Sequence, residues 1–160
     1  MPAAFRTSAI LAGLVVFSTA LPAAARGLVL GTDPPGHCAE AGCSYLDGRG
    51  RCILSADGEG GLHLLMNGTK VRLKRLEQRP VSRRDMRIPN QPGNKMLSRY
   101  ASVESAIGNL QVQILDTVVR THGKCRRERD GCEAVDYRSR IQITAPRQTL
   151  TIGGRGWCND

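Results

Sequence analysis

Six cysteines carry the most recognisable chemistry in this 160-residue sequence: Cys38, Cys43, Cys52, Cys125, Cys132 and Cys158. Cysteine thiolates, together with the imidazole of His37, could bind zinc. The spacings Cys-x4-Cys and Cys-x8-Cys that join the first three cysteines differ from those of the common zinc modules. Residues 1–25 indicate export, as argued below, and an even number of cysteines in an exported chain is typical of disulfides. We therefore predict disulfide bonds and no metal site.

The spacing of the cysteines leaves most of the pairing open, because six cysteines can combine in many ways. Cys125 and Cys132 bracket only six residues, and we expect this pair to form a local bridge. Cys158 is two residues from the end of the sequence and follows a glycine-rich stretch. We predict that it bonds to Cys38, Cys43 or Cys52 and so ties the end of the chain to its beginning.

The sequence offers no recognisable catalytic set. Nucleophilic catalysis would require a Ser or Cys beside a His that a third group orients, and the histidines are His37, His63 and His122, with no Gly-x-Ser-x-Gly motif. The carboxylate pair of a glycosidase is equally hard to assign. No spacing sets any two of the candidates apart, namely Asp57, Glu59, Glu104, Asp116 and Asp136. We therefore predict no catalytic residues and no cofactor, and favour a protein that is not an enzyme.

Basic residues are the remaining lead, and they form two groups. The first group follows an expected strand into an expected loop: Arg72, Lys74, Arg75, Arg79, Arg83, Arg84 and Arg87. The second lies between two cysteines: Lys124, Arg126, Arg127 and Arg129. Clustered cations raise the local concentration of anions and steer association. The two groups predict a binding surface for an anionic partner, although a second interpretation, that they only solvate the surface, stays open.

An exported protein would meet three kinds of anionic partner: lipopolysaccharide phosphate, an anionic envelope polymer or an acidic protein. Nucleic acid is less favoured, because aromatic side chains for base stacking are few in residues 26–160: Tyr45, Tyr100, Tyr137 and Trp157. The sequence thus predicts a non-enzymatic periplasmic or secreted binding domain. The alternative is an inhibitor of a cell-wall or proteolytic enzyme, which would have to be acidic to attract a basic domain.

Residues 1–25 predict a signal peptide. A single cation, Arg6, precedes a short apolar stretch, and small residues follow Pro22, as signal peptidase requires. We expect cleavage after Ala25, a periplasmic or secreted destination and no stable membrane span after cleavage. Residues 26–160 then form a single domain; without Arg6, 22 Lys and Arg minus 14 Asp and Glu leave a net charge of +8.

Alternation of apolar and polar residues predicts several short strands. The strongest pattern places Asn67-Gly68 between Leu62–Met66 and Thr69–Leu76. Asn-Gly favours the two-residue type I′ turn of a hairpin, since both central residues need positive φ. Residues 95–107 could be a strand or a helix, and we favour a strand. Further strands are expected at residues 51–55, 110–119, 137–144 and 149–152.

Two segments lack such patterns. Residues 26–50 are rich in Gly and Pro and predict an irregular arm held by cysteines, while residues 77–94 contain three prolines and predict a long exposed loop. Six or seven short strands with glycine-rich turns favour an all-β fold. We predict a small disulfide-stapled sandwich or partly open barrel.

Several short motifs resemble those of small exported bacterial β-domain proteins that remain functionally uncharacterised. The resemblance rests on Gly42-Cys43-Ser44, on residues 57–61 and on residues 66–73. It continues at the end of the sequence, through Cys132, Tyr137, Ile141, Ile143 and the closing Gly156-Trp157-Cys158. The resemblance implies a β fold and carries no activity with it.

Overall fold

The computed structural model describes residues 28–32, 38, 42–56, 59–87, 90–103, 108–123 and 134–159. Within them the chain is all-β, as predicted, and carries two disulfides. None of the helical segments that the structure describes has the length and hydropathy needed to cross a bilayer. Several predicted features lie outside the described residues: the signal peptide, the Cys125–Cys132 bridge and the second basic group, Lys124, Arg126, Arg127 and Arg129.

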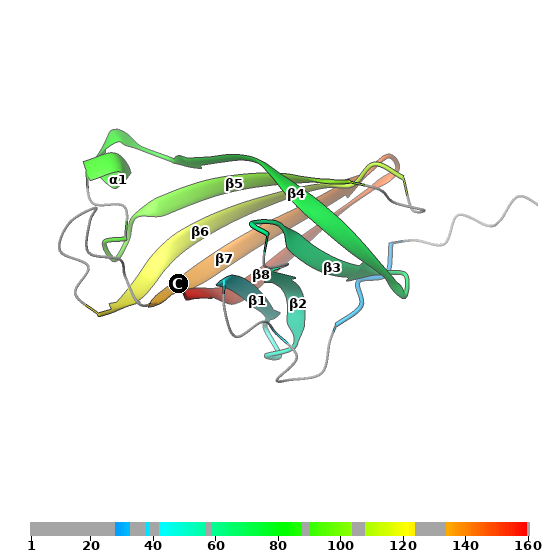
Figure 1. Cartoon of the computed structure of the whole chain (residues 1–160), viewed down its shortest axis with the longest axis horizontal. Helices are drawn as coiled ribbons and strands as arrows, with labels where there is room; N and C mark the ends of the chain where they lie inside the picture. The colour runs from blue at the N-terminus through cyan, green and yellow to red at the C-terminus, as the bar shows by residue number, and fades with distance from the viewer. Residues whose placement is uncertain are drawn as a thin grey trace, which may run out of the picture.

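Eight antiparallel strands form a closed barrel in which each strand pairs with the next and β8 pairs with β1 (Figure 1). The described elements are β1 (Gly42–Asp47), β2 (Cys52–Ala56), β3 (Leu62–Met66), β4 (Thr69–Pro80), α1 (Arg83–Arg87), β5 (Lys95–Ser102), β6 (Gln111–His122), β7 (Ala134–Ala145) and β8 (Gln148–Asn159). The structure therefore differs from the prediction of six or seven short strands in a sandwich or partly open barrel. Residues 95–102 are a strand, as favoured.

The difference arises where the two ends of the sheet meet, between β1 and β8. Glycines in this half of β8 looked like turn residues in the sequence, but they allow β1 to approach. A Cβ on Gly154 would collide with the backbone carbonyl of Leu46, and a Cβ on Gly156 would lie 2.7 Å from the ring of Tyr45. A larger residue would hold the two strands apart. β1 itself, predicted as part of an irregular arm, is a strand because β8 pairs with it from Gly42 to Asp47.

One of the two disulfides joins the two strands of this closure. Cys43 of β1 bonds to Cys158 of β8, which confirms that Cys158 joins one of the N-terminal cysteines. Cys38 bonds to Cys52 at the start of β2. These four cysteines are disulfide-bonded and are therefore not zinc ligands. The described residues contain no group of three or more His, Cys, Asp or Glu that could hold a metal ion.

The hairpin predicted around Asn67-Gly68 is present, with φ of 51° and 77° at the two turn residues. The strand that follows the turn is longer than predicted. β4 continues to Pro80, and α1 comes next, so the prediction of a loop over residues 77–94 is wrong for this part. The segment is ordered although it has few apolar residues, because hydrogen bonds hold it. The buried Asp85 accepts hydrogen bonds from both the backbone N–H and the hydroxyl of Ser82.

Inside the barrel, the side chains change character along the strands. One part is a continuous apolar cluster that includes Leu54, Leu64, Leu73 and Ile141, all fully buried. Next to this cluster, polar side chains replace the apolar ones. On β6, the inward residue that follows Ile114 is the buried Asp116. The described part of the interior is therefore apolar in one part and polar in the other.

Candidate functional site

The predicted basic residues of β4 lie in an extended row. Arg72 and Arg79 are seven residues apart on one strand, which separates them by about 23 Å at the usual rise per residue. Arg72 pairs with Glu59, and Arg79 pairs with Glu77 at 2.7 Å. Glu77 also binds Arg99 at 3.2 Å. Arg72 and Arg79 therefore each have an acidic partner within the protein.

The rest of the predicted first group is also exposed. Lys74 and Arg75 follow along β4, and Nη1 of Arg75 donates to Oε1 of Gln78 at 2.9 Å. Arg83, Arg84 and Arg87 project from α1 at the far end of β4. None of these basic residues lines the hollows described below.

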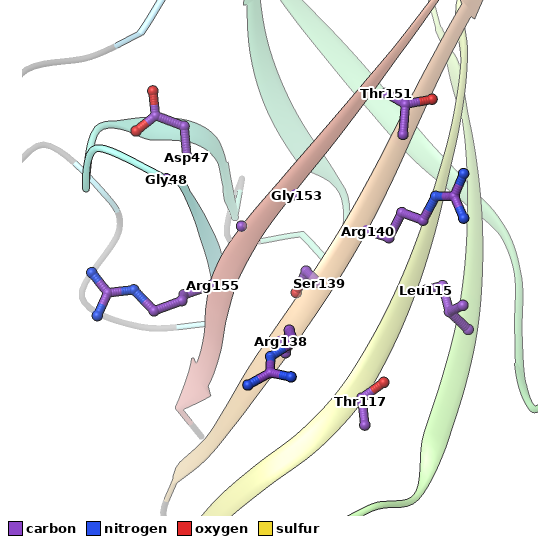
Figure 2. Close-up of a pocket in the computed structure, with 11 residues that line it drawn as sticks. Asp47, Gly48, Leu115, Thr117, Arg138, Ser139, Arg140, Thr151, Gly153 and Arg155 are labelled. Carbon is purple, nitrogen blue, oxygen red and sulfur yellow. The ribbon is translucent and has the colours of Figure 1, made fainter.

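A different group of arginines lies on the outer face of β7 and β8. Arg138 of β7 is the direct cross-strand neighbour of Arg155 of β8. Their sequence neighbours Ser139 and Gly156 are buried in the barrel, so the two arginines point outward, and Figure 2 shows them projecting from adjacent strands. Like charges placed directly opposite each other on a sheet destabilise it. The pair therefore favours binding of a negative charge between the two guanidinium groups.

Two carboxylates, Asp47 and Asp136, line hollows together with this pair, and both have other partners. Asp47 forms an ion pair with Arg51 at 2.7 Å and accepts hydrogen bonds from the backbone N–H groups of Arg49 and Arg51. These bonds, above all the one from the backbone of Arg51, hold the pKa of Asp47 below its usual value. Asp136 binds Nε2 of His122 at 2.9 Å. Within the described part of the chain, no carboxylate forms an ion pair with Arg138 or Arg155.

Two hollows adjoin the arginine pair and share it. The larger, of about 820 Å³, opens beside Gly153, which stands opposite Arg140 and leaves a gap where another residue would have a side chain. The smaller, of about 400 Å³, is lined by Trp157 and Val119 among others. Both volumes fall within the range of about 300–1,000 Å³ that ligand sites commonly have. We call this region, from Trp157 across Arg138 and Arg155 to Gly153, the β8 face.

A buried polar cluster supports the β8 face from inside the barrel. Oδ1 of Asp116 accepts a hydrogen bond from the hydroxyl of Ser139 at 2.5 Å, and Oδ2 accepts one from the hydroxyl of Tyr45 at 3.1 Å. Burial raises the pKa of Asp116 to about 6, although both hydrogen bonds oppose the rise. Ser139 is also the residue between Arg138 and Arg140. The cluster therefore fixes β1, β6 and β7 in register directly beneath the arginines.

The same cluster lies inside the barrel, where Ser139 and Asp116 are both buried. The hydroxyl of Ser139 donates to a carboxylate, and no described histidine contacts it. His122 lies at the end of β6 and His63 on β3.

Sequence reasoning did not single out Arg138, Arg140 and Arg155 as site residues. The alternation along residues 137–144 placed the first two on one face of a strand, which was a usable signal. Arg155 gave none, because it lies among glycines, and only the pairing of β7 with β8 places it opposite Arg138. Comparison with models of known protein families, with characterised proteins and with solved structures finds no match.

Proposed function

We propose that this protein is a non-enzymatic binding domain that holds the anionic group of its partner between Arg138 and Arg155. The observation that carries the proposal is the direct opposition of these two exposed arginines, neither of which forms an ion pair with Asp47 or Asp136. Guanidinium groups bind carboxylate and phosphate oxygens through two parallel hydrogen bonds, which makes arginine well suited to such a site. An anion at this position would also remove the repulsion between the two cations.

The disulfides support an extracytoplasmic setting, because disulfide bonds persist in oxidising compartments. Cys43–Cys158 and Cys38–Cys52 are thus compatible with the export predicted from residues 1–25. In this proposal the partner is an anionic component of the cell envelope or an acidic protein. The row of charges on β4 contributes long-range attraction, which raises the rate of association more than the affinity.

The test compares two variants with different charge losses. Arg138→Ser/Arg155→Ser removes two charges from the β8 face, whereas Arg79→Ser/Arg83→Ser/Arg84→Ser/Arg87→Ser removes four from β4 and α1. Affinity for immobilised polyphosphate and polyglutamate would be measured at low salt and at about 0.15 M salt, where the Debye length is about 8 Å.

The double variant should lose about tenfold or more in affinity, because one hydrogen bond to a charged group contributes about 1.5–3 kcal/mol. The quadruple variant should lose less, although it loses twice the charge. The reverse order would contradict the proposal and return the anion site to β4 and α1. Equal binding by all three proteins would show that these arginines are ordinary surface charge.

A further inference from the structure

The smaller hollow of the β8 face combines apolar side chains with charged ones. Val119 is 54% exposed although it is apolar. It occupies a register shift between Val118 and Arg120, where β6 carries one residue more than β7. A bulge of this kind turns a side chain to a new direction. It places Val119 in the same hollow as Trp157, beside the two arginines.

Hydrogen-bonding groups border the same hollow. Asp136 lines it and is the direct cross-strand neighbour of Trp157. Its carboxylate is 45% exposed, and only one of its oxygens binds His122. The hollow therefore offers an aromatic surface, a carboxylate that accepts hydrogen bonds and two guanidinium groups that donate them.

This combination matches the chemistry of a sugar ring that carries a negative charge. The C–H face of a pyranose packs on an aromatic ring, its hydroxyl groups donate to a carboxylate, and its acidic substituent binds arginine. An acyl chain would fill the apolar part but would shield Asp136 from water without offering a hydrogen bond, which costs free energy. Nucleic acid fits less well, because stacking of successive bases uses several aromatic side chains and Trp157 is the one tryptophan of the chain.

The second hollow extends the site beyond one ring. It lies on the other side of Arg138 and Arg155 and is lined by the hydroxyl groups of Thr117 and Thr151 (Figure 2). A ligand that occupied both hollows would cross the arginine pair at its middle. Two hollows joined by a cationic bridge suit a chain of linked units better than a single small anion.

We propose that the β8 face binds an anionic oligosaccharide, with one sugar ring on Trp157 and a carboxylate or phosphate of the chain between Arg138 and Arg155. This inference rests on the function proposed above and names the class of partner. The chain continues from the Trp157 hollow, past the arginines, into the hollow beside Gly153.

The single tryptophan makes the inference directly measurable, because a ring stacked on Trp157 changes its fluorescence emission. Four probes would be titrated: an oligogalacturonate, a phosphorylated mannan fragment, a neutral maltooligosaccharide of equal length and a polyglutamate of equal charge. At least one anionic saccharide should bind about tenfold more tightly than the maltooligosaccharide and the polyglutamate, and should shift the Trp157 emission. Which of the two binds identifies the acidic group as carboxylate or phosphate.

Variants separate the two proposals. Trp157→Ala should weaken saccharide binding by about tenfold, similar to the loss of one nucleic-acid base stacked on an aromatic side chain, and leave polyglutamate binding unchanged. Trp157→Phe should restore most of the affinity. If polyglutamate bound as tightly as both saccharides, without an emission change, the saccharide inference would be wrong while the anion site stood. A single-stranded oligonucleotide would be titrated as a further probe, and tighter binding of it than of both anionic saccharides would also overturn the saccharide inference. If no anion depended on Arg138 and Arg155, both proposals would fail together.

Discussion

The outer faces of β4 and β8 both carry arginines, but they treat charge in different ways. On β4, Arg72 and Arg79 pair with Glu59 and Glu77, and Arg75 binds a glutamine. On β8 and its neighbour β7, Arg155 faces Arg138, and the described carboxylates nearby bind other groups. β4 carries more cations, and some of them, such as Lys74, also lack an ion pair, but on the β8 face two arginines stand directly opposite each other and neither has an ion pair in the described part of the chain. A count of charges therefore says less about binding than the cross-strand neighbours do.

The charges of β4 also have a structural explanation. β3 pairs with β4 only as far as Leu73, so residues 74–80 pair with β5 on one side, and no described strand covers their other edge. Exposed strand edges template unwanted association, and charged residues and proline on the edge prevent it. Arg75, Arg79 and Pro80 fit this role. β8 meets the same problem differently, because β1 and a disulfide cover its second half.

The largest expected effect comes from opening that disulfide. Cys43–Cys158 spans 115 residues and Cys38–Cys52 spans 14. On the chain-entropy model, loops of about 100 and about 15 residues correspond to about 4.7 and about 3 kcal/mol of stabilisation. Cys43→Ser/Cys158→Ser should therefore lower the melting temperature more than Cys38→Ser/Cys52→Ser. It should also weaken anion binding, since Arg155 lies near the opened closure; equal losses of stability would remove the special role of β8.

The next effect concerns pH and the cluster beneath the β8 face. Because burial raises the pKa of Asp116 from 3.8 to about 6, the folded state holds its proton more tightly than the unfolded state. The stabilisation is present below about pH 4 and is lost as the pH rises through 6. For Asp116, a change in pKa from 3.8 to about 6 corresponds to about 3 kcal/mol. Tyr45 and Tyr100, which face Asp116, stay neutral in this range, since burial raises their pKa values.

Asp116→Asn removes this titration and keeps a hydrogen-bond acceptor for Tyr45 and Ser139. Urea unfolding of both proteins at pH 4, 5, 6 and 7 would give the free energy of unfolding at each pH. As the pH rises, the free energy of unfolding of the variant should increase relative to that of the wild type. Most of this change should fall between pH 4 and 6. A constant difference would show that Asp116 is ionised in the folded protein throughout.

Two adjacent glycines of β8 allow a sharper comparison within the face itself. Gly154→Ala introduces a Cβ against the carbonyl of Leu46 and should cost about 1–3 kcal/mol of stability, as overpacking does. Gly153→Thr places its side chain in open space and should change stability by no more than about 0.5 kcal/mol. It should nevertheless weaken oligosaccharide binding, because the new side chain fills the larger hollow. Undiminished binding by Gly153→Thr would remove that hollow from the site.

The sequence predicted what depends on local pattern. The alternation in residues 137–144, the Asn67-Gly68 turn and the bond from Cys158 to an N-terminal cysteine are all present in the structure. What it could not give depends on contacts between distant residues. Gly154 and Gly156 look like turn glycines until β1 is laid against them. Arg155 faces Arg138 only because of the β7 and β8 register, so the β8 face was not visible beforehand.

The smallest expected effect is on β4 and α1. Arg79→Ser/Arg83→Ser/Arg84→Ser/Arg87→Ser removes one ion pair, Arg79 with Glu77, while Arg99 still binds that glutamate. Exposed ion pairs contribute about 0–1 kcal/mol, and all four side chains are exposed. The free energy of unfolding should therefore change by no more than about 0.5 kcal/mol, measured by urea denaturation.

The informative readout for this variant is association rather than stability. Residue 79 lies on the stretch of β4 whose outer edge no described strand covers, and loss of its charge should promote edge-to-edge contact. Light scattering at rising protein concentration should show aggregation in the quadruple variant, while Arg138→Ser/Arg155→Ser, whose strands are paired on both sides at these positions, stays monodisperse. Aggregation of both proteins to the same degree would mean that net charge alone keeps the barrel apart, and the two arginine surfaces would then differ only in what they bind.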